Sequence, residues 1–422
     1  MAIHIVQRGE TLWNISQIYG APVETIRAVN GLPTIDRLTP GLSLYIPDQH
    51  LSMRYYKIKA GDTINKLAQQ FNTSPFQLYD ANPGLNPSQL TVGSVLVIPS
   101  PNKNVLKTLG FIVPNPGVSY TSTLEGIANN LTYIAVAAYS FTEEGYVYIQ
   151  TDDDNILSAS KQWDVTPLLM VRNYTDEDFN PELIGNVLKE PVFRRNFIDS
   201  LLHFIMEKGY GGVSIDFEFI PPLQRANFVV FLYELKQRLG SLLLHVNVHA
   251  KTEDIPSNPI IGAYDYEEIG NVADIVAVMT IDYGYPTGPP NPISPIWWME
   301  QVIRFATSLI DPNKLQVSFP LYGYDWKVPE NTTSARSVLN AQNLAIQSGS
   351  IIQYDTNAAS PFYHYWKAGE NHIVWFEDIR SFQEKYKLLD IYNLLGTTYW
   401  QISLPFPQNW RFVSENLIIS KE

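Results

Sequence analysis

Residues 211–219 read Gly-Gly-Val-Ser-Ile-Asp-Phe-Glu-Phe, and this short alternating stretch says most about the fold. Alternate residues of a β-strand share a face. The apolar residues therefore form one face, which can pack against helices, while Ser214, Asp216 and Glu218 form the other. A strand with helices on its apolar side and polar groups on its enclosed side fits the wall of a barrel of parallel strands.

Apolar runs of similar length recur on both sides of this stretch, with helical patterns such as 192–208 and 223–239 between them. Eight strands with intervening helices predict an α/β fold, a (β/α)8 TIM barrel over residues 105–422. The interval between the seventh and eighth strands is long, so we expect a small α+β insertion over about 327–374, with a helix at 335–347. The predicted strands lie at 109–113, 132–137, 167–171, 212–217, 243–248, 275–280, 316–320 and 398–402.

The first hundred residues contain an internal repeat. Val6–Leu12 aligns with Ile58–Ile64, and the spacing of 52 residues persists without gaps across each copy. A constant spacing indicates two copies of one module. Each copy reads as strand, helix, helix, strand (βααβ), with a turn before the first helix and a threonine as its N-cap. We place the two modules at 3–48 and 55–100, ahead of the barrel.

The Gly-(Glu/Asp)-Thr-(Leu/Ile) turn and the later Asn, Gly and Ile-Pro of each copy resemble the LysM module. The resemblance implies binding of glycans that contain N-acetylglucosamine, such as peptidoglycan or chitin, and two weak modules on one chain can raise apparent affinity. The alternative is that these residues only form turns and caps. The implied glycan-binding residues are Gly9, Glu10, Thr11, Asn30, Gly31 and Leu32 in the first copy and Gly61, Asp62, Thr63, Asn82, Pro83 and Gly84 in the second.

The composition excludes several classes of protein. The chain of 422 residues is 45% hydrophobic and 17% charged, so it can form a large core. It has no cysteine, which excludes disulfides, thiolate metal sites and a cysteine nucleophile. Its net charge of −13, without a Lys/Arg cluster, argues against nucleic acid as a partner. We find no signal-peptide pattern and no apolar run near the ~18 residues of a membrane span, so we expect a soluble protein without membrane contact.

Asp216 and Glu218 are the strongest candidates for catalysis. Two strand residues at positions i and i+2 lie roughly 6–7 Å apart by strand rise. In a shielded cleft two such carboxylates resist simultaneous ionisation, so one pKa should rise, as a general acid requires. The alternative, a solvated strand end, fits less well because acidic pairs in an otherwise apolar strand are costly.

The same stretch resembles the strand-four motif of glycoside hydrolase family 18, Asp-Gly-x-Asp-x-Asp-x-Glu. The resemblance implies that Glu218 is the catalytic acid and that Asp216 is the last Asp of the motif. The first and second Asp are replaced by Gly211 and Ser214, and we expect the Ser214 hydroxyl to hydrogen-bond Asp216 instead. This reduced motif, together with N-terminal LysM modules, resembles the spore-cortex branch of the family.

The sixth predicted strand ends in a second family pattern. Met-Thr-Ile-Asp at 279–282 resembles the family's Met-x-Tyr-Asp, with Asp282 in place and Ile281 where the family has Tyr. Tyr283 or Tyr285 is expected to replace that phenol near the substrate.

Two aromatic residues at later strand ends complete the implied site. Trp400 corresponds to the Trp that the family keeps beneath the sugar at the cleavage site, where a flat apolar ring suits a pyranose. An ordinary core position is the alternative. Tyr324 lies in a segment after the seventh strand, 322–326, that also resembles the spore-cortex group.

The resemblance implies a retaining, substrate-assisted hydrolysis. Glu218 would protonate the glycosidic oxygen while the substrate's 2-acetamido carbonyl attacks C1. Asp216 would orient the acetamide N–H and stabilise the oxazolinium, with help from Asp282. The implied substrate is bacterial spore-cortex peptidoglycan, cut at N-acetylglucosaminyl bonds, and the implied location is the spore, after synthesis in the mother cell. We expect a monomer without cofactor or metal.

Three other functions stay open at this level. A chitinase would share every motif above, and a non-catalytic glycan-binding protein on an inactive barrel would lack turnover although Glu218 is present. A metal-dependent deacetylase would need a ligand set, and only His245 and His249 lie close in sequence, without an acidic ligand in metal spacing. For these two histidines we favour packing within the fifth strand.

Overall fold

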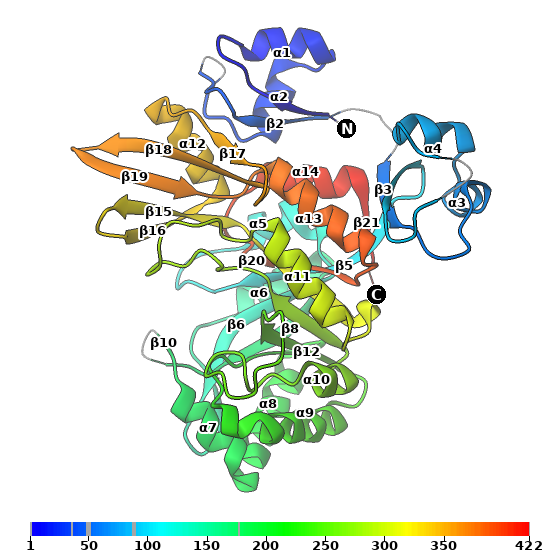
Figure 1. The fold of residues 1–422 in the computed structure, drawn as a ribbon. Helices are drawn as coiled ribbons and strands as arrows, with labels where there is room; N and C mark the ends of the chain where they lie inside the picture. Colours follow the sequence, from blue (N-terminus) through cyan, green and yellow to red (C-terminus); the bar gives the residue numbers. More distant parts are fainter. Residues whose placement is uncertain (1, 35–36, 48–51, 87–89, 176–177, 422) are drawn as a thin grey trace.

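The computed structural model describes residues 2–34, 37–47, 52–86, 90–175 and 178–421. Its central element is a closed barrel of eight parallel strands, because β5 pairs with both β6 and β20 (Figure 1). The first residue of β20, Gly396, lies very close to β5 where these two strands pair, since a Cβ on Gly396 would lie 1.8 Å from the Lys107 carbonyl oxygen. The barrel strands are β5 (Asn104–Ile112), β6 (Tyr133–Phe141), β8 (Thr166–Arg172), β11 (Gly212–Asp216), β12 (Leu243–His249), β13 (Ile275–Met279), β14 (Leu315–Pro320) and β20 (Gly396–Trp400).

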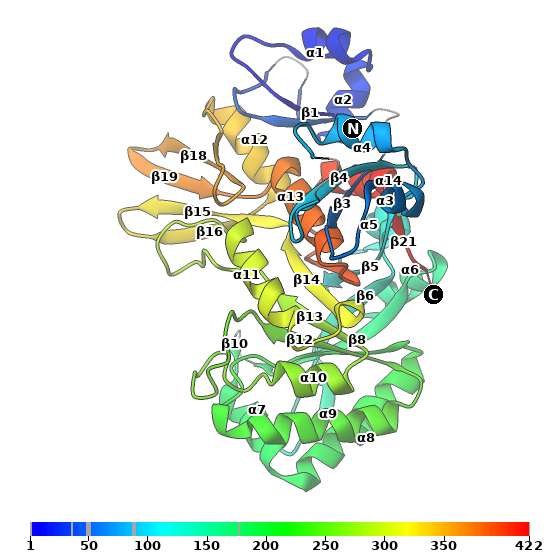
Figure 2. The ribbon, with the colours of Figure 1, turned by 45° about the vertical axis from the view of Figure 1, so that its right-hand side comes forward.

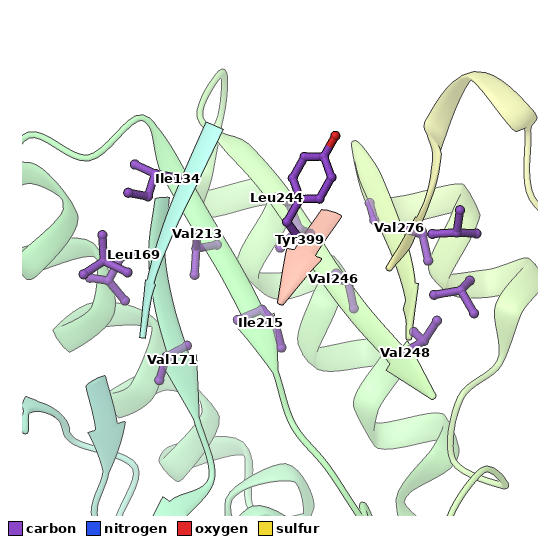
Figure 3. Close-up of a cluster of buried hydrophobic side chains, with 14 of the residues drawn as sticks. Ile134, Leu169, Val171, Val213, Ile215, Leu244, Val246, Val248, Val276 and Tyr399 are labelled. Atoms are coloured by element: carbon purple, nitrogen blue, oxygen red, sulfur yellow. The ribbon is translucent and has the colours of Figure 1, made fainter. Parts of the chain in front are cut away.

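The strands alternate as predicted, which confirms the barrel. Val213, Ile215 and Phe217 are almost fully buried and pack in the layer between strands and helices. Figure 3 shows the aliphatic side chains that neighbouring strands contribute to this layer, among them Val246 and Val248.

Helices surround the barrel (Figures 1 and 2). None of the helices in the described ranges is both long and apolar enough to cross a membrane. Four short strands lie outside the barrel. β7 (Val147–Ile149) pairs with β6 and β21 (Leu417–Ile419) pairs with β5, while β9 (Tyr174–Thr175) and β10 (Asp178–Phe179) pair with each other. The helices are α5 (Thr121–Ile127), α6 (Asp154–Gln162), α7 (Pro181–Lys189), α8 (Pro191–Lys208), α9 (Arg225–Leu239), α10 (Tyr266–Val272), α11 (Ile296–Thr307), α13 (Ile379–Ile391) and α14 (Pro407–Asn416).

The expected insertion follows β14 as a five-stranded antiparallel sheet with one helix, α12 (Val338–Ser348). It starts at Tyr322, earlier than the predicted residue 327, because β15 leaves the barrel almost directly from β14. The sheet projects beside the barrel in Figure 1. Its strands are β15 (Tyr322–Val328), β16 (Thr332–Ser337), β17 (Gln353–Asp355), β18 (Ser360–Lys367) and β19 (Glu370–Trp375).

Two βααβ units precede the barrel, each with one antiparallel strand pair. The first strand of the second unit begins before the expected boundary at residue 55, and the expected end of the first unit, residue 48, lies outside the described residues. The first unit comprises β1 (Ala2–Ile5), α1 (Leu12–Tyr19), α2 (Val23–Val29) and β2 (Ser43–Ile46). The second comprises β3 (Ser52–Lys57), α3 (Ile64–Gln70), α4 (Pro75–Ala81) and β4 (Val95–Ser100).

Candidate active site

A cavity of about 770 Å³ lies at the carboxyl-terminal ends of the barrel strands. Asp216, Glu218, Asp282, Tyr324 and Trp400, all selected from the sequence, line it together. Residues from many parts of the chain meet here because the carboxyl ends of parallel barrel strands share one face.

Asp216 is the most deeply placed acid of the site. It is 4% exposed, and β-sheet register puts it directly beside Arg172 on β8. Burial raises the pKa of Asp216 well above its ordinary value, the charge of Glu218 raises it further, and Arg172 opposes both. Arg172 is itself buried and lies over the Tyr174 ring, 4.7 Å from its centre. The site therefore holds a protonatable acid beside a fixed cation.

Glu218 lies just beyond the end of β11 and is fixed through its backbone. The buried Asn173 side chain accepts a hydrogen bond from the Glu218 N–H and donates one to the Glu218 carbonyl, both 2.9 Å long. The Glu218 carboxylate lies 3.2 Å from His249 Nε2, an ion-pair distance without hydrogen-bond alignment. Glu218 therefore keeps its position while its side chain, which lines the cavity, stays 18% exposed.

Asn173 and His249 were missed by the sequence analysis, and the assignment of His249 to strand packing is wrong. His249 lines the cavity, whereas His245, on the same strand, is fully buried as expected. Both missed residues had a readable signal. Asn173 directly follows an apolar strand, and His249 shares the inward face of β12 with His245 and Asn247.

Ser214 does not support Asp216, which corrects the sequence-based expectation. Its hydroxyl is fully buried and lies 2.9 Å from His245 Nδ1, and it accepts a hydrogen bond from Asn247 Nδ2 at 3.1 Å. Burial lowers the pKa of His245 to about 4, so this histidine is neutral. A fully buried hydroxyl cannot contact a sugar, so Ser214 belongs to the packed interior beneath the cavity.

Asp282 receives its phenol partners from the insertion. Its carboxylate accepts hydrogen bonds from Tyr322 (2.6 Å) and Tyr324 (3.0 Å) on β15. Asp282 keeps an exposed surface, but the protein atoms around its carboxyl group displace water and raise its pKa, while the two hydroxyl donors lower it. Tyr322 was missed because nothing in the sequence indicates which strand of the insertion reaches the cavity.

Tyr283 and Tyr285, the expected replacements for the family's Tyr, lie elsewhere. The Tyr283 ring packs against Trp297 and Trp298, with centroid distances of 5.3 and 5.4 Å. Tyr285 is 49% exposed and lies outside the cavity wall. Neither phenol therefore lines the cavity, although Pro286 of the same loop does.

Trp400 forms part of the cavity wall at the end of β20. Its ring packs on Phe111 with a centroid distance of 5.3 Å, and it contacts the aromatic cluster at the base of the insertion. The indole is thus held in place while part of its surface stays open to the cavity.

In the two βααβ units, the turn residues have the same local roles in both copies. Gly9 and Gly61 adopt φ values of 87° and 85°, which favour glycine. Glu10 and Asp62 each accept a hydrogen bond from the backbone N–H three residues earlier, at 2.6 and 2.7 Å. These contacts shape the turn and leave its outer surface exposed.

Four further selected residues of these units, two threonines and two asparagines, are engaged in internal hydrogen bonds. Thr11 and Thr63 cap α1 and α3, at 3.2 and 3.3 Å. The Asn30 and Asn82 side chains each join the end of the second helix to the last strand through three backbone hydrogen bonds of 2.7–2.9 Å. These two asparagines hold the fold of the unit. Asn30 is fully buried and cannot contact a glycan in this arrangement, whereas Asn82 keeps part of its surface exposed and its assignment to glycan contact stays a prediction.

A closed barrel with paired carboxylates and an indole in its carboxyl-terminal cavity is the arrangement of a glycoside hydrolase. The chain belongs to the glycosyl hydrolases family 18, which matches residues 174–404, and residues 4–47 and 56–99 match the LysM domain.

Relatives of similar length support this assignment. The chain is 33% identical to YdhD of Bacillus subtilis (strain 168) over 97% of both chains. It is 30% identical to the cortical fragment-lytic enzyme of Bacillus cereus, covering 99% of this chain and 98% of that protein. The crystal structure of the Bacillus cereus spore cortex-lytic enzyme SleL is similar with a TM-score of 0.86 at 30% identity, covering 100% of this chain and 99% of that one.

Proposed function

We propose that this glycoside hydrolase is an N-acetylglucosaminidase that cleaves spore-cortex peptidoglycan fragments with retention of configuration. The observation that carries the proposal is the placement of Asp216 and Glu218 in one cavity with Asp282 and Trp400. The similarity to a cortical fragment-lytic enzyme over nearly the whole of both chains supports the substrate class. It also supports a location at the spore.

In the first step, Glu218 donates a proton to the glycosidic oxygen. Asn173 fixes the Glu218 backbone, so the Glu218 carboxyl group is already positioned for proton transfer to the glycosidic oxygen. As the bond to the leaving group breaks, the acetamido carbonyl of the substrate attacks C1 and forms an oxazolinium ion. The leaving sugar takes the proton from Glu218, which becomes a carboxylate.

Asp216 and Asp282 hold the acetamido group during this attack. Asp216 lies beside Arg172, and its carboxylate accepts a hydrogen bond from the acetamide N–H and stabilises the positive charge that develops on that group. Asp282, fixed by the Tyr322 and Tyr324 hydroxyls, orients the group from another side. Water, deprotonated by Glu218, then opens the oxazolinium ion and restores the original configuration.

The LysM units are proposed to bind the same class of glycan. Products from purified cortex fragments, identified by mass spectrometry, test the proposal. We expect new reducing-end N-acetylglucosamine and no change in the peptide parts of the fragments. Faster hydrolysis of chitin oligomers than of cortex fragments would instead support the chitinase alternative. No turnover of either glycan would contradict both the proposed function and the chitinase alternative.

A further inference from the structure

The two LysM copies differ in what surrounds them. Gly41 and Gly93 occupy the same place in the repeat, just before the last strand. A Cβ on Gly41 would lie 1.8 Å from the Ile352 carbonyl oxygen, whereas a Cβ on Gly93 would have nothing within 4 Å in the part of the chain that the structure describes. The first copy is therefore packed against the catalytic domain at a place where the second copy faces solvent.

The covered part of the first copy includes half of the expected glycan groove. We call residues 9–11 and 61–63 the turn lips, and residues 30–32 and 82–84 the loop lips. In the first copy, Gln342 of α12 donates a 2.9 Å hydrogen bond to the Asn30 carbonyl. A Cβ on Gly31 would lie 2.6 Å from Leu339, so this loop lip touches the insertion helix directly.

Further contacts fix the first copy as part of the catalytic unit. Its core side chains form one cluster with Ala341, Ala345 and Ile346 of α12. Gln408 of α14 donates hydrogen bonds to Asn30 Oδ1 (2.7 Å) and to the Ser43 carbonyl (2.9 Å). Figures 1 and 2 show this unit lying against α12 and α14. A glycan therefore cannot use the loop lip of the first copy unless α12 and α14 move away from it.

The second copy has its own core and leaves both lips free. Among the described residues, none has an atom within 4 Å of a Cβ added to Gly61 or Gly84, and Pro83 is exposed. The attachment of this copy to the barrel uses a different side, through β3, where Arg54 pairs with Asp390 at 2.7 Å.

The attachment point lies at the end of the barrel opposite the cavity. Arg54 also donates to the side chain of Asn104, the first residue of β5, at 3.2 Å. Asp390 lies at the end of α13, just before the chain returns to the start of β20. The cavity is at the other end of these strands, where Trp400 ends β20. Nine residues of β5 correspond to roughly 30 Å of strand between the two ends.

We propose that the first LysM copy is a structural part of the catalytic unit with a closed groove, and that glycan anchoring falls to the second copy alone. Because the free groove lies at the end of the barrel away from the cavity, the enzyme holds one glycan segment while it cleaves another. This inference rests on the proposed function only for the identity of the glycan.

The absence of cysteine allows a direct test in the full chain. Three proteins carry Glu218→Gln, to prevent hydrolysis, and one further change each: Arg8→Cys, Ala60→Cys or Pro83→Cys. Arg8 and Ala60 are exposed and occupy the same position of the repeat, so they form a matched pair beside the turn lips. The rate of maleimide labelling is measured with and without a soluble N-acetylglucosamine oligosaccharide.

We expect the oligosaccharide to slow labelling severalfold in the Ala60→Cys and Pro83→Cys proteins and to leave the Arg8→Cys protein unchanged. Equal protection of the Arg8→Cys protein would show that the first groove is open and would overturn the inference, as would protection of none. Turnover of soluble cortex fragments by the protein with Glu218 intact tests the proposed function separately. If the protein with Glu218 intact does not turn over these fragments while the labelling rates follow the expected pattern, the proposed function is contradicted. The inference that only the second LysM copy binds glycan then still holds.

Discussion

Asp216 lies beside Arg172 and Glu218 lies 3.2 Å from His249, whereas the family motif supplies a second carboxylate at the position of Ser214. A serine cannot share a proton with Asp216, and its hydroxyl is directed to His245. The positive charge beside Asp216 comes instead from Arg172 on the neighbouring strand β8. This arrangement explains how the site tolerates a reduced motif.

His249 should act as a positioning residue for Glu218. Replacing it by Gln removes the partner 3.2 Å from the carboxylate and keeps a polar side chain of similar reach. We expect kcat to fall about tenfold, equivalent to ~1.4 kcal/mol, with KM little changed. Steady-state kinetics on soluble fragments measure this, with His203→Gln on the exposed surface as the matched control. A rise in KM at constant kcat would point to substrate binding instead.

The ionised carboxylate of Asp216 should lower the free energy of unfolding at neutral pH. Its folded pKa is raised above the unfolded value, so its protonated form stabilises the fold at low pH. That contribution is lost as the pH rises from about 4, the ordinary value of a free Asp, through the folded pKa. Asp216→Asn keeps the uncharged form at every pH, so we expect the unfolding free energy at pH 8 to rise by about 1–2 kcal/mol while turnover is severely impaired.

Urea denaturation at pH 4 and pH 8 checks this expectation. The Asp216→Asn protein should gain stability over the unchanged protein at pH 8 and little at pH 4. A stability difference of the same size at both values would show that burial of the charge is not the cause, and unaltered kinetics would remove Asp216 from the mechanism.

The acid pair was predictable because it depends only on strand geometry. Residues two apart share a face, and a strand end in a barrel faces the cavity. The same rule applied to β12 would have identified His249. The partners of Asp282 were not predictable in this way, since Tyr322 and Tyr324 reach it only through the docking of a separate sheet.

Among the elements, β15 of the insertion contributes most directly to the site. It leaves the barrel at Tyr322 and carries alternate tyrosines toward Asp282. The insertion therefore completes the catalytic arrangement in addition to enlarging the fold. The barrel strands themselves were close to their predicted ranges, since each is a short buried apolar run. The start of the insertion was placed too late because β15 continues the apolar and aromatic character of β14.

Loss of a phenol should shift the pH dependence of activity. Both hydroxyls lower the pKa of Asp282, so Tyr322→Phe should raise it further and leave more of Asp282 protonated at a given pH. If ionised Asp282 orients the substrate, the acidic limb of the kcat/KM profile moves to higher pH. We expect a fall of about tenfold on that limb, ~1.4 kcal/mol for one hydrogen bond to a charged group. Tyr285→Phe, away from the cavity, is the control, and identical profiles for both variants would contradict the role of Asp282.

At the scale of the whole molecule, the sequence repeat conceals a structural difference. Both copies have the same internal hydrogen bonds at Asn30 and Asn82, so their similarity follows from local sequence. Which side of each copy packs against the catalytic domain depends on surfaces far apart in the chain, such as those of α12 and α14 for the first copy and of α13 for the second. No pattern within either copy could have predicted this packing.

The packing difference predicts unequal effects of matched substitutions. Gly41 and Gly93 have φ values of 83° and 89°, so alanine strains both backbones similarly, by about 1–3 kcal/mol. Only Gly41→Ala also meets the Ile352 carbonyl, and we expect it to lose about 1–3 kcal/mol more. Thermal unfolding followed by circular dichroism compares the two. Equal losses would mean that the first copy is not held against the catalytic domain.

The most direct test of the account is the Glu218→Gln protein, assayed for both turnover and binding of cortex fragments. Gln keeps the shape of the side chain and cannot donate or accept the catalytic proton, and general acid–base catalysis is worth about a hundredfold to ten-thousandfold. We predict that turnover falls at least by that range while the dissociation constant for the fragments changes little. A rate near that of the unchanged protein would contradict the assignment of Glu218 and, with it, the proposed mechanism.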